Sequence, residues 1–323
     1  MGLLVEGKWT TEDTRPNADD GRYLRAASGI RHRVTADGSS GFKAEKGRYH
    51  LFASWSCPWA HRTMILRRLK GLEGVISLSV AEGGLMERGW KFADLSDALP
   101  QTGKRPGFLH EVYTRAEPGY SGRVTVPVLW DKERETIVNN ESREIIRMLD
   151  TEFDEFGDHR RNFLPRHLAP QVEETIDAIY EPINNGVYKS GFARSQEAYE
   201  AAVTALFEAL DRWEGVLAGQ RYLCGDELTE ADWCLFPTLL RFDLVYYSHF
   251  KCNLRRIADY PNLWNYTKEL YQVPGVAEVC NLDQIKAGYY RGQEWVNPTR
   301  IVPKGPLIDF STPHDRATRR YAS

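Results

Sequence analysis

The chain has 323 residues and a formal net charge of −3, and 42% of its residues are hydrophobic, 12% aromatic and 27% charged. These values are typical of a soluble globular protein with one or two domains, and they argue against a general binder of nucleic acid or of an anionic membrane surface. No apolar run reaches the ~20 residues that cross a bilayer, and the first residues lack the pattern of a secretory signal. We therefore expect a cytoplasmic protein without a nucleic-acid or membrane partner.

The cysteines give no sign of a crosslink or a metal site. Their number is odd, and no two of them have Cys-x-x-Cys spacing. This pattern predicts neither a disulfide framework nor a bound metal, and it fits a reducing compartment. The five positions are Cys57, Cys224, Cys234, Cys252 and Cys280.

The N-terminal third predicts an extended arm followed by the start of an α/β domain. Residues 1–48 are rich in Gly, Asp, Arg and Ser without sustained periodicity, which indicates an arm lying over the body or over a partner subunit. Residues 49–53 predict a short apolar strand. After a short turn, Cys57 and Pro58 open a helix that Gly71 ends, because proline is well tolerated at the first helical position.

The following elements complete a mixed α/β unit over residues 49–155. A second strand is expected at 75–80, and the segment 81–122 is too long for a simple connection, so we expect a short helix within it near 109–115. Residues 125–130 and 136–138 predict a hairpin. A helix follows with Ser142 as its N-cap.

Beyond about residue 165 the sequence predicts only helices. A capping box at Thr229–Asp232 precedes a long apolar helix. The other helices are expected at 171–184, 195–217, 261–270 and 276–287. We therefore predict an all-α domain over 165–288 and a C-terminal tail over 289–323.

Cys57 is the candidate nucleophile. A thiol at a helix N-terminus lies beside free backbone N–H groups and the positive end of the helix dipole, which favour the thiolate and can lower a cysteine pKa below ~8.5. Ala60 occupies the position where a dithiol enzyme has its second cysteine, so an external thiol would have to resolve a mixed disulfide. The alternative is an inert cysteine packed under the first turn. His61 could tune the thiol, although a packing role is the better interpretation.

Two further features would accompany such a nucleophile. The proline in Val126-Pro127 stands at the entrance to a strand, where a cis bond would free the preceding backbone for a peptide-like substrate; a trans proline on an edge strand is the alternative. Glu141 and Ser142 begin a helix and offer groups that suit a carboxylate, although an ordinary N-cap would look the same.

These residues resemble the glutathione transferase superfamily, which combines a thioredoxin-like α/β N-terminal domain with an all-α C-terminal helical domain. The segment Ser54-Trp55-Ser56-Cys57-Pro58-Trp59-Ala60-His61-Arg62 is similar to the active-site segment of its Xi class, the glutathionyl-hydroquinone reductases. Similar blocks span most of the chain. They are residues 89–92, 126–131, 139–142, 184–189 and 301–306.

The resemblance implies a reaction and a set of site residues. Cys57 would take glutathione from a glutathionyl-hydroquinone as a mixed disulfide, and a second glutathione would release oxidised glutathione. Glutathione would be held by Trp90, Arg123 near its glycyl carboxylate, the backbone of Val126, and Glu141 and Ser142 at its γ-glutamyl end. The aromatic leaving group would meet Tyr188 and Tyr290, and with less support Tyr246, although core packing is the alternative for each tyrosine.

The resemblance also implies a homodimer that uses glutathione as co-substrate and no metal. Two other functions stay open at this stage. One is a general glutathione-dependent thiol transferase or dehydroascorbate reductase, which would use the same cysteine on small disulfides. The other is a non-enzymatic scaffold, in which Cys57 would be unreactive.

Overall fold

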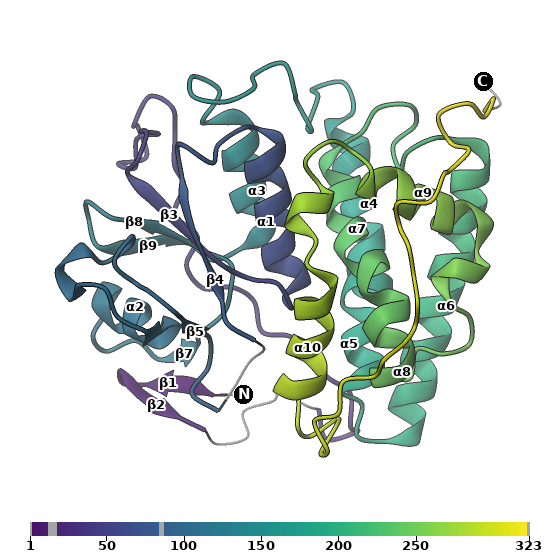
Figure 1. Cartoon of the computed structure of the whole chain (residues 1–323), viewed down its shortest axis with the longest axis horizontal. Coiled ribbons are helices and arrows are strands. Elements are labelled where there is room, and N and C mark those ends of the chain that lie inside the picture. The colour runs from purple at the N-terminus through teal and green to yellow at the C-terminus, as the bar shows by residue number, and fades with distance from the viewer. Residues whose placement is uncertain (1, 12–17, 84–86, 322–323) are drawn as a thin grey trace. The chain divides into compact units, whose positions relative to one another are not determined.

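The computed structural model describes residues 2–11, 18–83 and 87–321, which form two compact units (Figure 1). The first unit contains Ala26–Arg161 and Val279–Glu294 together with the N-terminal strands. The second contains Asn162–Glu278, the C-terminal segment Trp295–Ser323 and the described part of Pro16–Arg25. The predicted fold class, a thioredoxin-like α/β domain and an all-α helical domain, is confirmed. The domain boundaries inferred from the sequence stay a prediction.

A mixed four-stranded sheet organises the first unit, in the order β4-β3-β8-β9 (Figure 1). Its strands are β3 (Tyr49–Ser54), β4 (Ser77–Ala81), β8 (Val128–Asp131) and β9 (Thr136–Asn139). Strand β3 runs parallel to β4 and antiparallel to β8, and all six of its residues are buried. The strand predicted from the apolar run at 49–53 is therefore confirmed, and the structure shows it to be a central strand of the sheet.

The helices of this unit follow the sequence pattern closely at α1 and less closely at α3. Helix α1 (Pro58–Leu69) begins at the predicted proline, and Gly71 with φ +66° follows its end. Helix α3 (Ser142–Thr151) has Glu141 as its N-cap, so the prediction that Ser142 caps it is wrong. The Glu141 carboxylate reaches the N–H of Arg143 at 3.1 Å, and Ser142 becomes the first helical residue.

The expected hairpin exists, but its first strand is shorter than predicted. Strand β8 begins at Val128, whereas the sequence indicated residue 125. Pro127 has no N–H for a sheet hydrogen bond, and the Val126–Pro127 peptide is cis, so the chain joins the ladder only after the proline. Strand β4 likewise begins at Ser77 and not at residue 75.

The long insert between β4 and β8 adds to the hydrophobic core. It holds the strand pair β5 (Lys91–Phe92) and β6 (Gly107–Phe108), the 3₁₀ turn η1 (Pro100–Thr102), helix α2 (Leu109–Ala116) and β7 (Gly122–Arg123). The helix expected near 109–115 is therefore confirmed. Buried residues of the insert and of the sheet form one hydrophobic cluster. This cluster includes Phe52, Phe92, Leu109, Tyr113 and Trp130.

The N-terminal residues form a strand pair where the sequence indicated only an extended arm. Strands β1 (Leu3–Val5) and β2 (Lys8–Thr10) are antiparallel, and β1 also pairs with β7 of the insert. Glu6 and Gly7 join them with φ values of 46° and 76°, which is the backbone of a type I′ turn. The arm is thus partly built into the first unit by backbone hydrogen bonds.

The second unit is helical, as predicted. Ser195 caps the longest helix and accepts the N–H of Ala198 at 3.2 Å. The predicted capping box is present, because the N–H of Thr229 donates to Asp232 at 2.8 Å. The α-helices are α4 (Ala169–Ile179), α5 (Gly186–Gly191), α6 (Gln196–Gly219), α7 (Glu230–Arg241), α8 (Tyr247–His249) and α9 (Pro261–Tyr271). Shorter π- and 3₁₀-turns are η2 (Tyr180–Asn184), η3 (Phe242–Tyr246) and η4 (Ile257–Asp259).

The last predicted helix has the wrong bounds. Only a 3₁₀ turn, η5 (Ala277–Val279), lies near its expected start, and the helix itself is α10 (Leu282–Gly292). Asn281 caps α10 by accepting the N–H of Gln284 at 3.0 Å, which fixes the later start. Helix α10 belongs to the unit of the sheet.

A buried arginine fastens the C-terminal segment to the helical unit. The Arg316 side chain is fully buried, and it pairs with Glu269 at 3.2 Å and donates to the carbonyl oxygens of Leu217 and Gln220. Such a buried charge is tolerated because its donors are satisfied.

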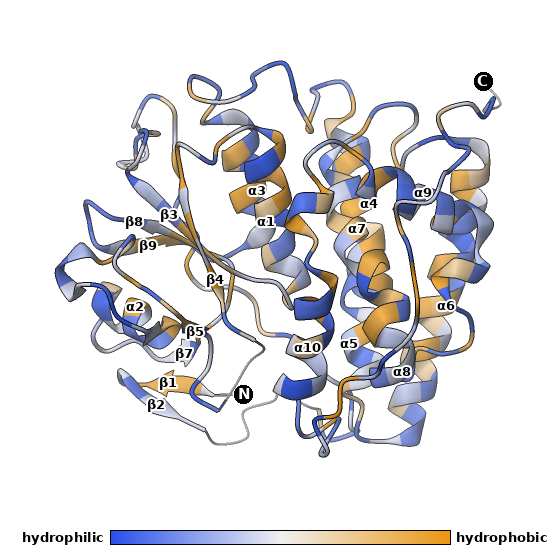
Figure 2. Ribbon diagram, in the orientation of Figure 1, coloured by the Kyte–Doolittle hydropathy of each residue, from blue (hydrophilic) through white to orange (hydrophobic). Residues whose placement is uncertain are grey.

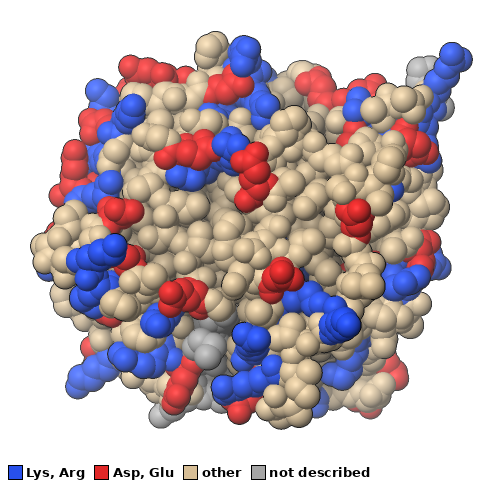
Figure 3. Space-filling view, in the orientation of Figure 1, with Lys and Arg blue, Asp and Glu red and all other residues tan. Residues whose placement is uncertain are grey.

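Hydrophobic and charged residues occupy different parts of the molecule. Hydrophobic residues concentrate on the strands of the sheet and on helices such as α7 (Figure 2). Acidic and basic side chains are interspersed on the face shown in Figure 3. Among the described residues, no helix has the length and apolarity to cross a membrane.

A buried histidine in the central strand makes the stability of the first unit depend on pH. Burial, with smaller contributions from Lys132 and Arg67, lowers the pKa of His50 from 6.5 to about 3. Below pH 6.5 the unfolded chain therefore binds a proton that the folded chain excludes. The stability contributed by neutral His50 is complete above pH 6.5 and is lost as the pH falls from 6.5 toward 3.

We expect the His50→Gln variant to lose less stability than the wild type between pH 7.5 and 5, by about 2 kcal/mol. Urea unfolding at both pH values measures the free energy of unfolding. The slope that is compared is the change in this free energy between the two pH values, so any pH-independent loss of stability from the buried amide cancels. His159→Gln, at an exposed position, is the control and should keep the wild-type slope. Equal slopes for the wild type and His50→Gln would contradict the prediction.

Candidate active site

Cys57 lies where the central strand passes into helix α1. Its N–H donates to Ser54 at 3.2 Å, and the residue is the N-cap of the helix with an extended backbone, φ −83° and ψ 116°. The sulfur accepts the N–H of Ala60 at 3.5 Å. Ala60 stands where a dithiol enzyme has its second cysteine. Its backbone N–H donates to the sulfur of Cys57 and favours the thiolate form.

The loop before β8 faces this sulfur. The Cys57 thiol donates to the carbonyl oxygen of Val126 at 3.4 Å, and Val126 is buried. The bond from Val126 to Pro127 is cis, as the first of the two sequence interpretations had it. The structure thus brings together two of the predicted site residues that are 69 positions apart.

The start of α3 is joined to α1 by a buried arginine. Arg62 stacks over the ring of Trp59 at 4.5 Å and donates to the hydroxyl of Ser142 at 3.4 Å. Glu141 accepts a hydrogen bond from Ser28 of the arm at 3.0 Å. The sequence analysis did not foresee these contacts of Arg62 and Ser28, because their partners lie 80 and 113 positions away along the chain.

Three other predicted residues belong to the same unit. Trp90 is half-buried before β5, and its carbonyl accepts the N–H of Leu109 at 2.9 Å. Arg123 is half-buried in β7, and its carbonyl accepts the hydroxyl of Tyr120 at 3.3 Å. Tyr290 is a buried residue of α10. Their functional roles stay predictions.

Tyr188 and Tyr246 lie together in the helical unit. Their ring centroids are 6.0 Å apart, in an aromatic cluster that also contains Phe192 and Phe250. The guanidinium of Arg25 lies 4.8 Å above the Tyr188 ring. Because Arg25 also donates to Asn185 at 2.8 Å, a residue of the N-terminal arm contributes to this cluster.

Cys57 is the most accessible of the five thiols, all of which the structure describes. It is half-buried, and the other four are buried. Burial raises the pKa of the Cys224 and Cys252 thiols, which keeps them protonated. The sulfur of Cys280 lies 3.6 Å from the Nε2 atom of His61, and His61 is buried. This position fits the packing interpretation of His61.

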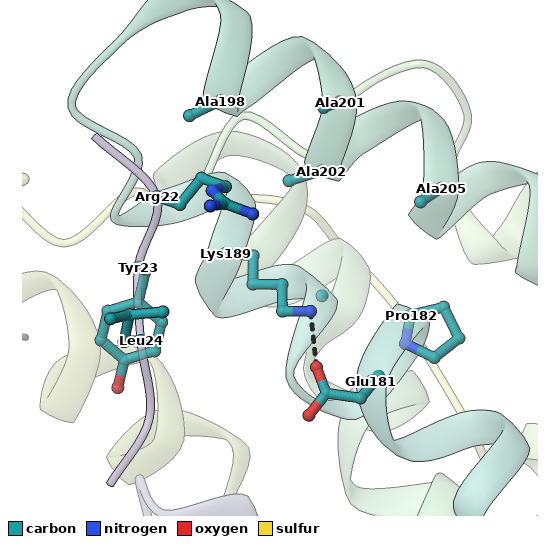
Figure 4. A pocket seen from close by; sticks show the side chains of 11 residues that line it. Arg22, Tyr23, Leu24, Glu181, Pro182, Lys189, Ala198, Ala201, Ala202 and Ala205 are labelled. Carbon is teal, nitrogen blue, oxygen red and sulfur yellow. Dashed lines mark ion pairs between the residues drawn. The ribbon is translucent and has the colours of Figure 1, made fainter. Parts of the chain in front are cut away.

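A separate cavity lies within the helical unit. It has a volume of about 380 Å³ and is lined by alanines of α6, including Ala198 and Ala202, with Arg22 of the arm (Figure 4). The ion pair between Lys189 and Glu181 also borders it. None of the predicted site residues lines this cavity. Within the described ranges, no group of three or more His, Cys, Asp and Glu side chains could hold a metal ion.

The site in the first unit can perform thiol chemistry on a peptide-like ligand. It combines a thiol at a helix N-terminus, a backbone carbonyl beside that thiol and the N-terminus of a second helix. The carbonyl can pair with an extended backbone, and the second helix end favours a carboxylate. The three elements come from the ends of β3, of the insert and of β9.

Comparisons with known proteins identify both parts of the chain. The family model for the glutathione S-transferase N-terminal domain matches residues 56–152, and the model for its C-terminal domain matches residues 196–269. The glutathionyl-hydroquinone reductase YqjG of Escherichia coli is 49% identical over 99% of both chains. The glutathionyl-hydroquinone reductase PcpF of Sphingobium chlorophenolicum is 48% identical, over 95% of this chain and 96% of the relative.

Solved structures agree over nearly the whole length. The Xi class glutathione transferase from Natrialba magadii has a TM-score of 0.89 and 49% identity, covering 98% of this chain and 97% of that protein. The glutathione-bound structure of Escherichia coli YqjG also has a TM-score of 0.89, with 46% identity, covering 99% of this chain and all of that one.

We expect native protein to present one rapidly reacting thiol. Iodoacetamide at pH 7 should label Cys57 first, because the other four cysteines are buried. Mass spectrometry of the intact protein over time, followed by peptide mapping, measures the site and the rate. Cys57→Ser should abolish the rapid phase, whereas the control Cys224→Ser should retain it. Rapid labelling that persists in Cys57→Ser would contradict the assignment.

Proposed function

Since this chain belongs to the Xi class of the glutathione transferase superfamily, we propose that it is a glutathionyl-hydroquinone reductase with Cys57 as its nucleophile. The observation that carries the mechanism is the position of this thiol, capped by the N–H of Ala60 and facing the carbonyl of Val126. The enzyme names of the relatives support the substrate class.

The first step transfers glutathione to the enzyme. The Cys57 thiolate attacks the sulfur of the glutathionyl-hydroquinone, and the bond between that sulfur and the ring carbon breaks. The electron pair of that bond goes to the ring carbon. This carbon takes a proton, and the ring leaves as hydroquinone. Cys57 is then joined to glutathione by a disulfide.

The second step returns the free enzyme. The thiolate of a second glutathione attacks the glutathione sulfur of the mixed disulfide, which gives oxidised glutathione and the Cys57 thiolate. Over both steps, two glutathione sulfurs, one from the aryl thioether and one from the free thiol, are oxidised to a disulfide, and one aryl carbon is reduced. Ala60 leaves no neighbouring thiol to compete for the mixed disulfide, so glutathione itself acts as co-substrate and no metal is needed.

The residues around Cys57 would hold the glutathionyl group of both substrates. The backbone of Val126 would pair with the cysteinyl part, and Ser142 and Glu141 would hold the γ-glutamyl end at the start of α3. Arg123 would bind the glycyl carboxylate. Trp90 would pack against the same ligand.

The tyrosines would serve the aromatic group. A phenol can donate a hydrogen bond to a hydroquinone oxygen, which eases departure of the negatively charged ring carbon. Tyr188 and Tyr290 would have this role, with Tyr246 lining the pocket beside Tyr188. The cation over Tyr188 would strengthen this phenol as a donor.

Two other functions make different demands on Cys57. A general thiol transferase would prefer small disulfides to aryl thioethers, and the names of the relatives favour the aryl substrate. A scaffold would not need a half-buried thiol that accepts a backbone N–H at the start of a helix.

We also propose that the protein is a cytoplasmic homodimer with glutathione and glutathionylated aromatic compounds as its partners, and with neither nucleic acid nor membrane among them.

Hydroquinone release tests the proposed function. With a glutathionyl-hydroquinone and excess glutathione, the wild type should release hydroquinone and oxidised glutathione in equal amounts, measured by chromatography. Cys57→Ser should lose this activity by at least ~1,000-fold, because the four remaining thiols are buried and none stands at the position of Cys57 to accept glutathione. Cys224→Ser, a buried cysteine of the helical unit, is the control. Reduction of small disulfides without hydroquinone release would favour the thiol transferase.

A tyrosine variant separates the two halves of the reaction. We expect Tyr188→Phe to lower kcat for hydroquinone release by about 100-fold, the range for loss of a positioned proton donor. Reduction of a small glutathione mixed disulfide should stay within about twofold, because its leaving group is a thiolate. Tyr199→Phe, which loses a hydroxyl bonded to Lys251, should retain both activities. Equal losses in both assays would contradict a leaving-group role for Tyr188.

A further inference from the structure

We propose that Tyr113, in helix α2 of the insert, is a positioning residue for glutathione, because its hydroxyl joins the backbone next to Val126 to the start of α3. This inference rests on the proposed function, since it concerns the same binding site. Tyr113 is a member of the buried core and lies outside every motif by which the sequence resembles the family.

All three hydrogen-bonding positions of the hydroxyl are occupied. It donates to the carbonyl oxygen of Thr125 at 3.1 Å and accepts the N–H of Thr125 at 3.4 Å. It also accepts the side-chain amide of Asn140 at 3.1 Å. A hydroxyl has one hydrogen and two lone pairs, so its capacity is fully used. Burial raises the pKa of Tyr113, which keeps this hydrogen in place.

The bond to Thr125 sets the direction of a substrate-binding group. The carbonyl of Thr125 and the N–H of Val126 belong to one planar peptide unit and point in opposite directions. When Tyr113 holds that carbonyl, it also fixes the direction of the Val126 N–H. The Val126 backbone is the group expected to pair with the cysteinyl part of glutathione.

The bond to Asn140 reaches the other end of the site. Asn140 immediately precedes Glu141 and Ser142, which are expected to hold the γ-glutamyl end. Its side-chain oxygen accepts the N–H of Ile30 at 3.2 Å, and its own backbone N–H donates to Ile30 at 3.1 Å. The arm therefore fixes this side chain with its amide nitrogen toward Tyr113.

One hydroxyl thus connects the groups at the two ends of the proposed ligand. The ring of Tyr113 is held within the core, where it contacts Tyr120 at a centroid distance of 5.0 Å. Rotation of the Thr125–Val126 peptide, or a shift of Asn140, would have to break a hydrogen bond inside a dry core. The insert consequently has a positioning function in addition to its contribution to burial.

The test compares two tyrosines with buried hydroxyls. Tyr113→Phe keeps the ring and removes the three bonds. Tyr49→Phe removes a hydroxyl that donates to the carbonyl of Lys43 at 2.6 Å in the same unit. Glutathione affinity is measured by calorimetry, thermal unfolding gives stability, and iodoacetamide labelling without glutathione gives the reactivity of Cys57.

We expect Tyr113→Phe to weaken glutathione binding about tenfold and to raise the KM for glutathione similarly, with Cys57 labelling within twofold of wild type. Tyr49→Phe should bind glutathione as the wild type does, even if it unfolds at a lower temperature. Asn140→Ala should also weaken glutathione binding. The double variant should lose less affinity than the product of the two single-variant fold losses. Such coupling distinguishes positioning from a general loss of stability.

Two outcomes would overturn the inference. One is wild-type affinity in Tyr113→Phe, and the other is an equal loss of affinity in Tyr49→Phe. If wild type releases hydroquinone and either result is found, the positioning role alone is wrong. If the wild type neither binds glutathione nor releases hydroquinone, the proposed function is wrong as well.

Discussion

The contact on which the site depends is the hydrogen bond from the N–H of Ala60 to the sulfur of Cys57. It requires that a buried strand end one turn before the helix and that proline take the first helical position. Both conditions are met by residues 49–58, which are fixed by burial and by backbone chemistry. The thiol then lies at a helix N-terminus, where the backbone N–H groups and the helix dipole stabilise a negative charge. The chemistry proposed for Cys57 follows from this geometry.

The other elements of the first unit reach this thiol through long-range contacts. The loop at Val126 is 69 residues away, and Ser142 is linked to α1 by the buried Arg62. The arm supports the same region, since Ser28 bonds to Glu141 and Ile30 exchanges two bonds with Asn140. Buried hydrogen bonds hold together a site that is assembled from so many separate segments, and breaking one of them would leave a buried polar group unpaired at a cost in free energy.

The sequence predicted those features that have a local cause. A continuous apolar run, apolar residues at helical spacing, a helix-opening proline and capping residues revealed β3, α1, α2 and α6, and they pointed to Cys57 without any knowledge of the fold. The errors lie where a local signal had a competitor. At the start of α3, both Glu141 and Ser142 have a side-chain oxygen that can accept an N–H, and Glu141 is the N-cap. Helix α10 begins after its N-cap Asn281, which lies later in the chain than the start of the apolar pattern. Pro127 shortened β8. The strand pair of β1 with β7 could not be foreseen, because its partner is more than a hundred residues away.

The same limit explains why the candidate site was only partly foreseen. Arg62 lies in the active-site segment, whereas Ser28 and Tyr113 lie in no motif. The importance of all three arises from long-range contacts that the folded chain creates. The two units also differ in the chemistry that they offer. Backbone groups, hydroxyls and a helix N-terminus surround Cys57, whereas aromatic rings surround Tyr188. The groups around Cys57 suit a peptide-like ligand that carries a carboxylate. A reductase of glutathionyl-hydroquinones and a thiol transferase would both need these groups, so only the proposed role of Tyr188 would distinguish the two enzymes.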